Sequence, residues 1–362
     1  MALLCLSSGI RPRYREDVLR AASMPKGSRL RFRYLAELVP DELRAKLSAN
    51  VLIGSDVVIA YLARYDASVP PTAVPIRGAK LWSSKVAGQI VLLDFELEEF
   101  RVAENVQAFN NALRVEADFP RWEGNVLQGA FCNRIHKTLA YVQPGSGVDR
   151  WQDLVGTLRR HRDFDDIPFF YYVTGVYSPN GKEPLIPEQG CWGLKANETY
   201  EIRLIQSIPG SDEKGSIKIG DVDWLVAQAE DENVSFLSTN RLAIDSPYDE
   251  KIVRLRTATS SLTRHSLVAF QRISPQRDKE SGAEGASTVE DAVWQFEMPL
   301  VISPRRWTLM WQGLLVGALL AAQALVPIWS NSQLADKGLV SIIAVVIGLL
   351  TGVVASFGLR KP

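Results

Sequence analysis

Arginines at alternate positions are the clearest candidates for binding chemistry in this sequence. Arg29, Arg31 and Arg33 alternate with apolar residues over residues 29–35, and this period of two predicts a half-buried strand with its guanidinium groups on one face. Three further arginines precede them: Arg11, Arg13 and Arg15. Such a basic stripe could hold a nucleotide, an oligonucleotide or anionic lipid headgroups. The alternative is a charged solvent face paired with three acids, Glu96, Glu98 and Glu99.

A second group of charges lies in residues 159–166, where Arg159, Arg160 and Arg162 stand beside one histidine and three aspartates. Guanidinium forks match phosphate or carboxylate oxygens, so these arginines could form an anion-binding edge. The alternative is a self-neutralising helix end, because basic residues also suit the negative end of a helix dipole.

Catalytic and metal-binding patterns are scarce. The sequence has no phosphate loop, no Gly-x-Ser-x-Gly elbow and no His-Glu-x-x-His motif. Cys132 and His136 would share a face if they lay on a helix, and such a pair can activate a thiolate. A buried thiol beside a partly exposed histidine is the competing interpretation. We therefore assign no catalytic residue, metal ligand or cofactor.

The elements expected to position the arginines form a mixed α/β domain over residues 1–165. A continuous apolar run at 57–63 favours a strand buried on both faces. Two more strands are expected at 76–82 and 89–97, joined through residues 83–88, and residues 66–75 are expected to form a loop. Helices are expected at three places: residues 39–47, 103–114 and 149–160.

Residues 166–303 have a different pattern, with short β-branched or aromatic runs separated by Gly, Pro, Asn and Asp. This spacing favours an antiparallel β-sandwich, for which an immunoglobulin-like arrangement is one option. The expected strands are 168–174, 199–205, 224–229, 234–237, 252–257, 266–272 and 292–298.

The C-terminal part, residues 304–362, predicts a two-helix transmembrane hairpin. Residues 307–329 and 339–359 contain no charged side chain, and each run is long enough to span a bilayer core, which takes ~20 apolar residues as a helix. The whole chain is thus expected to be α+β, mainly β, with three parts.

Charge around the spans predicts their orientation. Basic residues flank the outer ends of the hairpin, namely Arg305, Arg306, Arg360 and Lys361, whereas Asp336 and Lys337 cancel within the loop. Because positive flanks stay in the cytoplasm, we expect a multi-pass inner (plasma) membrane protein with both termini cytoplasmic. Three cysteines widely spaced in sequence agree with a reducing compartment. Residues 1–304 carry 36 basic and 40 acidic residues, a net charge of −4, which does not favour a general nucleic-acid binder.

The predicted spans contain more than an anchor needs. Small residues lie four apart in both, Gly313 with Gly317 and Gly348 with Gly352, and this pattern permits close helix packing in lipid. The amides of Gln312 and Gln323 would seek partners across helices. These residues could pack within one hairpin or join hairpins of several chains.

Three functions remain open from the sequence. The layout of a cytoplasmic head on a short hairpin resembles membrane effectors of bacterial immune (anti-phage) systems, which implies a sensor that binds an anionic ligand, such as a nucleotide, and forms a homo-oligomer in the lipid bilayer. The second is a non-catalytic scaffold whose β-sandwich recruits a protein partner. The third is a membrane-bound hydrolase using Cys132 or an acidic pair that is not evident from the sequence.

Overall fold

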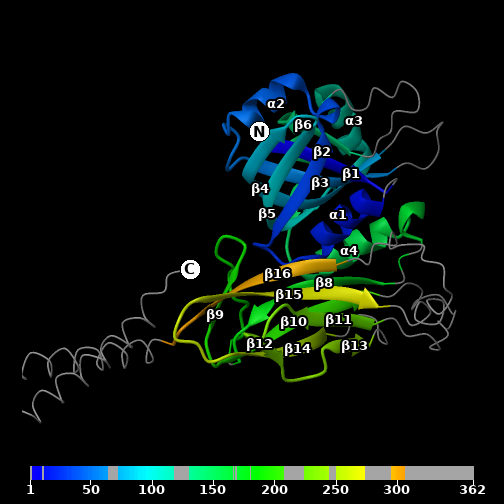
Figure 1. Ribbon diagram of the computed structural model, residues 1–362. Coiled ribbons are helices and arrows are strands. Elements are labelled where there is room, and N and C mark those ends of the chain that lie inside the picture. Colours follow the sequence, from blue (N-terminus) through cyan, green and yellow to red (C-terminus); the bar gives the residue numbers. More distant parts are fainter. Residues whose placement is uncertain are drawn as a thin grey trace, which may run out of the picture. The chain divides into compact units, whose positions relative to one another are not determined.

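The protein has a mainly β fold with several sheets, seen in a computed structural model (Figure 1). The structure describes residues 2–9, 12–63, 72–117, 130–165, 167, 169–179, 181–207, 224–243, 250–273 and 295–305. The chain forms two compact units. One comprises Met1–Gly193, Thr199–Arg256 and Ser266–Leu300, and the other comprises Leu194–Glu198, Thr257–His265 and Val301–Pro362.

The N-terminal sheet of the first unit has the strand order β2-β5-β4-β3-β1-β6, with β7 paired to β5. Its strands are β1 (Ala2–Ser8), β2 (Arg29–Leu35), β3 (Asp56–Ala63), β4 (Thr72–Ala87), β5 (Ile90–Val102), β6 (Ala130–Ile135) and β7 (Gln143–Gly145). β1 lies inside the sheet, parallel to β3 on one side and antiparallel to β6 on the other. Both β1 and β3 are apolar along nearly their whole length, which is why an interior position suits them.

Helices cover this sheet. They are α1 (Pro12–Ser23), α2 (Asp41–Ser48), α3 (Val106–Ala117) and α4 (Val148–Leu158), with short 3-10 turns η1 (Ala36–Leu38), η2 (Lys137–Tyr141) and η3 (Arg162–Phe164). Phe109 and Leu113, four residues apart on α3, are fully buried in a core cluster with Leu4 and Leu6 of β1. The helical period of the apolar residues therefore determines which face of α3 meets the sheet.

A carboxylate holds the start of η2. Glu116 accepts hydrogen bonds from the backbone N–H groups of His136, Lys137 and Thr138, at 2.5, 2.9 and 2.8 Å, and from the Thr138 hydroxyl at 2.6 Å. Burial raises its pKa, but these hydrogen bonds outweigh burial and lower the pKa of Glu116 to about 2. The ionised side chain thus ties α3 to the segment that follows β6.

Two further sheets follow in the sequence. A four-stranded sheet has the order β12-β14-β10-β8, and a five-stranded sheet has the order β13-β11-β15-β16-β9. Aromatic rings pack between them: Tyr171 of β8 stacks on Phe296 of β16 at 5.6 Å, and Phe296 stacks on Phe270 of β15 at 5.2 Å. The strands are β8 (Phe170–Tyr177), β9 (Trp192–Lys195), β10 (Thr199–Ser207), β11 (Trp224–Ala229), β12 (Val234–Phe236), β13 (Arg241–Ala243), β14 (Glu250–Thr257), β15 (Arg264–Ile273) and β16 (Gln295–Ser303).

The second unit is held by hydrogen bonds between its own segments. The Ser303 hydroxyl donates to the Leu194 carbonyl at 3.1 Å, and the Ala196 N–H donates to the Ser303 carbonyl at 2.8 Å. The Thr257 hydroxyl donates to the Lys195 carbonyl at 2.6 Å. These bonds join stretches that are more than fifty residues apart in sequence.

Most elements expected from the sequence are present, and two expectations were wrong. The strand at 29–35 and the helices near 39–47, 103–114 and 149–160 are confirmed. Residues 83–88 do not form an open connection, because β4 continues to Ala87 and turns at Gly88, whose φ of 57° suits glycine. Residues 72–75 belong to β4 and not to a loop. Pro75 is tolerated there because the register with β3 shifts beside it, at a bulge.

No helix within the described ranges is long and apolar enough to cross a membrane. The two predicted spans, residues 307–329 and 339–359, lie outside the residues that the structure describes. The same holds for Gln312, Gly313, Gly317, Gln323, Gly348 and Gly352. The transmembrane hairpin and its packing residues therefore stay predictions. The domain boundaries at 165 and 303 also stay predictions.

Candidate anion-binding pocket

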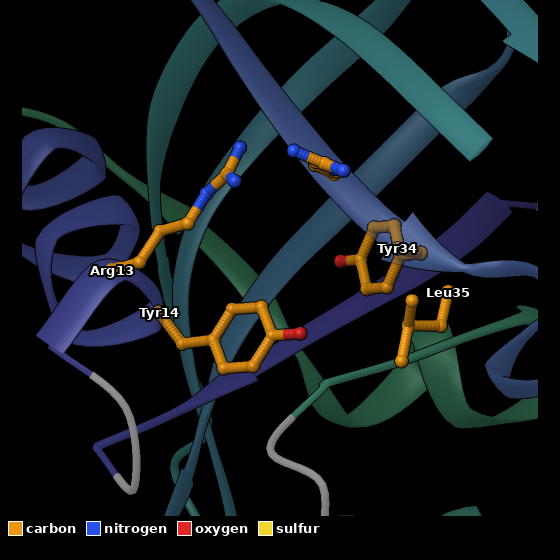
Figure 2. Close-up of a pocket in the computed structure, with 5 residues that line it drawn as sticks. Arg13, Tyr14, Tyr34 and Leu35 are labelled. Carbon is orange, nitrogen blue, oxygen red and sulfur yellow. The ribbon is translucent and has the colours of Figure 1, made fainter. Parts of the chain in front are cut away.

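A pocket of about 240 Å³ lies between the first turn of α1 and the end of β2. Arg13 and Tyr14 line it from the helix, and Arg33, Tyr34 and Leu35 line it from the strand (Figure 2). Both elements belong to the same compact unit. The pocket therefore combines two guanidinium groups, two phenol rings and one aliphatic side chain.

Strand geometry explains how β2 contributes both charge and aromatic surface. Side chains alternate across a strand, and the burial of β2 alternates with them: Leu30, Phe32 and Tyr34 are buried, whereas Arg31 and Arg33 are exposed. At the end of β2 the two faces meet the pocket together, because Arg33, Tyr34 and Leu35 all line it.

The start of α1 brings positive charge to the pocket. The helix begins at Pro12, a residue favoured in a first turn, and this turn contains no acidic residue. Arg13 therefore adds its charge to the positive end of the helix dipole instead of cancelling it. That arrangement is unfavourable for the isolated helix and favourable for an anion bound beside it.

The two phenols differ in their hydrogen bonding. The Tyr34 hydroxyl donates to the Leu6 carbonyl at 3.4 Å, and burial raises the pKa of Tyr34 well above its ordinary value. Tyr14 is 6% exposed, and within the described part of the chain its hydroxyl has no hydrogen-bond partner. Figure 2 shows the hydroxyls of Tyr14 and Tyr34 pointing into the space between α1 and β2. The Tyr14 hydroxyl is thus available to a ligand.

The three arginines of β2 have different environments. Arg31 forms a two-point ion pair with Asp94, with contacts of 2.6 and 3.1 Å. Burial raises the pKa of Asp94, but hydrogen bonds from Arg31 and Ser83 outweigh it and hold that pKa below its ordinary value. Arg29 stacks on the ring of Trp82, 3.9 Å from the centroid. Arg33 forms no ion pair with any residue that the structure describes, and it lines the pocket.

Asp17 lies one turn after Arg13 on α1 and interacts with it electrostatically. Its side chain is 4% exposed, and burial raises the pKa of Asp17 to about 7, although Arg20 and Arg13 lower it. Glu16 pairs with Arg20, whose Nη2 lies 3.4 Å from its carboxylate, and it also interacts electrostatically with Arg13. Near neutral pH, Asp17 is partly protonated, so it neutralises Arg13 only in part.

The arginines after α4 do not line this pocket. Arg159 donates from Nη2 to the Ser207 carbonyl at 2.5 Å and lies over the ring of Phe170, whereas Arg160 and Arg162 are exposed. Asp163 accepts a hydrogen bond from the Tyr61 hydroxyl at 2.5 Å. The cluster thus includes a contact between α4 and the four-stranded sheet, and a ligand-binding role for its arginines stays a prediction.

The Cys132–His136 pair does not lie on a helix, and this corrects the sequence-based geometry. Cys132 belongs to strand β6 and is fully buried, whereas His136 is exposed. A hydrogen bond with Cys5 and burial together raise the pKa of Cys132 well above its ordinary value. A thiol held in its protonated form is a poor nucleophile, so this pair offers no support for hydrolase chemistry. Among the described residues, no group of three acidic, histidine or cysteine side chains could hold a metal ion.

Sequence reasoning reached two of the pocket residues as parts of a basic stripe, Arg13 and Arg33, and missed the other three. Tyr14 carried a usable signal, because Tyr14, Val18 and Ala22 recur every four residues and are all buried on α1. The approach of α1 to the end of β2 is a tertiary contact that no local pattern reveals.

Comparison with protein-family models and with curated proteins finds no match for this chain.

Proposed function

We propose that this protein is a membrane-anchored sensor or effector whose N-terminal domain binds a small anionic ligand. The observation that carries the proposal is that Arg13 of α1 and Arg33 of β2 line the same pocket. Among the described residues, Arg33 has no ion-pair partner. Both arginines are exposed, so water solvates their charges in the empty protein. A bound anion would accept charge-assisted hydrogen bonds from them.

The anchor and the assembly of the protein rest on its sequence. The uncharged runs 307–329 and 339–359 support a transmembrane hairpin in the plasma membrane, with the head in the cytoplasm. The paired glycines and the two glutamines of those runs support contacts between hairpins of different copies. The two packed sheets of residues 166–303, in a sandwich arrangement, would join the ligand-binding domain to the anchor. Ligand binding would then favour clustering of the hairpins.

The full chain in detergent micelles tests the ligand part. Isothermal titration calorimetry with sulfate, inorganic phosphate and a mononucleotide should detect binding of at least one of these anions. The double variant Arg13→Gln/Arg33→Gln should weaken that binding by at least about 10-fold, because it removes two charged donors. The matched control is Arg160→Gln/Arg162→Gln, which removes two exposed positive charges outside the pocket.

The control separates the pocket from general electrostatics. Equal losses in both double variants would mean that overall charge attracts the anion and that the pocket is not the site. A loss only in Arg160→Gln/Arg162→Gln would place the ligand at the arginines after α4. Absence of binding for every anion would contradict the proposal itself.

A further inference from the structure

The donor set of the pocket indicates which anion it takes. Among the described residues that line it, the guanidinium groups of Arg13 and Arg33 and the Tyr14 hydroxyl can donate to a ligand, whereas the Tyr34 hydroxyl already donates to the Leu6 carbonyl. Among the described residues, no carboxylate or amide side chain lines the pocket, so a ligand hydroxyl or amine would find no strong acceptor side chain there. The ligand part that enters is therefore rich in acceptors.

The donors approach from two elements. Arg13 and Tyr14 come from the start of α1, and Arg33 comes from β2. A planar carboxylate offers two oxygens, which one guanidinium fork can occupy. A tetrahedral phosphate offers three terminal oxygens in different directions, so the helix and the strand can each bind one side of it. The Tyr14 hydroxyl, more than nine-tenths buried and without a partner among the described residues, supplies a further donor.

The volume of the pocket and its apolar lining limit the size and the chemistry of the group attached to the anion. A volume of about 240 Å³ is below the ~300–1,000 Å³ that is typical of sites for drug-sized molecules. The pocket has room for a phosphate and one small group, and none for an oligonucleotide. Leu35 and the rings of Tyr14 and Tyr34 offer apolar surface to that group.

We propose that the pocket binds a phosphate monoester with a small apolar or aromatic group, its phosphate held by Arg13, Arg33 and the Tyr14 hydroxyl. This inference rests on the proposed function and specifies its ligand class. The organic group lies against Leu35 and the tyrosine rings, so a monoester binds better than free phosphate.

Three probes of graded chemistry test the inference with the full chain in detergent: phenyl phosphate, inorganic phosphate and benzoate. Phenyl phosphate should bind at least about 10-fold more tightly than benzoate and several-fold more tightly than inorganic phosphate. Tyr14→Phe should weaken phenyl phosphate binding by about 10-fold, the worth of one hydrogen bond to a charged group, and leave the melting temperature nearly unchanged. Tyr141→Phe, at an exposed tyrosine outside the pocket, is the matched control.

The outcomes distinguish the ligand class from the proposed function. If benzoate binds as tightly as phenyl phosphate, and Arg13→Gln/Arg33→Gln still abolishes this binding, the preference for phosphate is wrong and the pocket is a general anion site. Equal affinities for phenyl phosphate and inorganic phosphate would overturn the monoester and identify free phosphate as the ligand. An unchanged affinity in Tyr14→Phe would overturn the assigned donor. No binding of any probe would overturn both proposals.

Discussion

The Sγ atoms of Cys5 and Cys132 lie 3.7 Å apart, although the two residues are separated by 127 positions in the sequence. They are direct partners in the antiparallel pairing of β1 with β6, and both side chains are fully buried. Both remain free thiols. The Tyr34 hydroxyl donates to the carbonyl of Leu6, the residue after Cys5 on β1, so this strand also supports the pocket.

The burial of this pair predicts a pattern of thiol reactivity. In the native protein, Cys191 should react quickly with a maleimide because it is partly exposed, whereas Cys5 and Cys132 should react only after unfolding. Mass spectrometry of the labelled peptides measures this directly. Cys191→Ser should remove all fast labelling. Fast labelling of Cys132 in native protein would contradict the buried β1–β6 pairing.

Two arginines on one face of β2 should respond differently to the same substitution. Arg33→Gln should weaken phosphate binding and leave stability nearly unchanged, since Arg33 has no ion pair with a described residue. Arg31→Gln should leave binding unchanged and cost up to about 1 kcal/mol of stability, because the Arg31–Asp94 pair is largely exposed on the Arg31 side. Calorimetric titration and thermal melts of both variants provide the measurements. The reverse pattern would show that Arg31 is the ligand contact.

Anion binding should depend on pH through Asp17. Its pKa of about 7 means that it gains charge as the pH rises through 7, and an ionised Asp17 competes with the ligand for Arg13. Sulfate keeps its charge in this range, so its affinity should fall between pH 6 and pH 8 for a reason that lies in the protein. Asp17→Asn should remove this dependence. A dependence that persists in the variant would assign the titration to another group.

Asp17 should also make folding less favourable at high pH. Its folded-state pKa lies above the ordinary value of 3.8, so the native state binds more protons and stability falls as the pH rises from about 4 to 7. Asp17→Asn should therefore stabilise the protein at pH 8 by on the order of 4 kcal/mol, with little gain at pH 4. Urea unfolding at both pH values checks the sign. A larger gain at pH 4 than at pH 8 would contradict the buried carboxyl.

Assembly of the hairpins should depend on their glycines. Gly348→Leu/Gly352→Leu adds bulk where close packing is expected and keeps the span apolar. If the protein is a sensor–effector, cross-linking in intact membranes should show ligand-dependent oligomers for the natural sequence and fewer for the variant, while phosphate binding is retained. A scaffold that recruits a protein partner should keep its function in both. If the protein is a monomer under all conditions, the effector hypothesis is wrong and the tethered scaffold is the better account.

Local patterns predicted the β2 strand and three of the helices, because alternation and the helical period depend only on neighbouring residues. The different environments of Arg31 and Arg33 could not be predicted in this way. They depend on the register of β2 against β5, which places Arg31 opposite Asp94 and Arg33 opposite Leu92. The same limitation applied to the cysteines, whose spacing suggested that they were unrelated until β1 was seen beside β6.

The pocket illustrates a different limit. Its arginines were visible as charge, and the period of Tyr14, Val18 and Ala22 could have revealed α1. The absence of an acid in the first turn of α1 was also readable from the sequence. No sequence pattern predicts that the first turn of α1 approaches Tyr34 and Leu35, because this contact forms only when the helix packs on the sheet.

The interior position of β1 has a consequence for synthesis on the ribosome. β1 is made well before its antiparallel neighbour β6, which begins only at Ala130. At ~5–20 residues per second, the edge of β1 that will face β6 stays uncovered for on the order of ten seconds. An uncovered strand edge is a template for wrong pairing between nascent chains. The yield of native protein should therefore depend on how well β1 is kept from wrong pairing until β6 has been made.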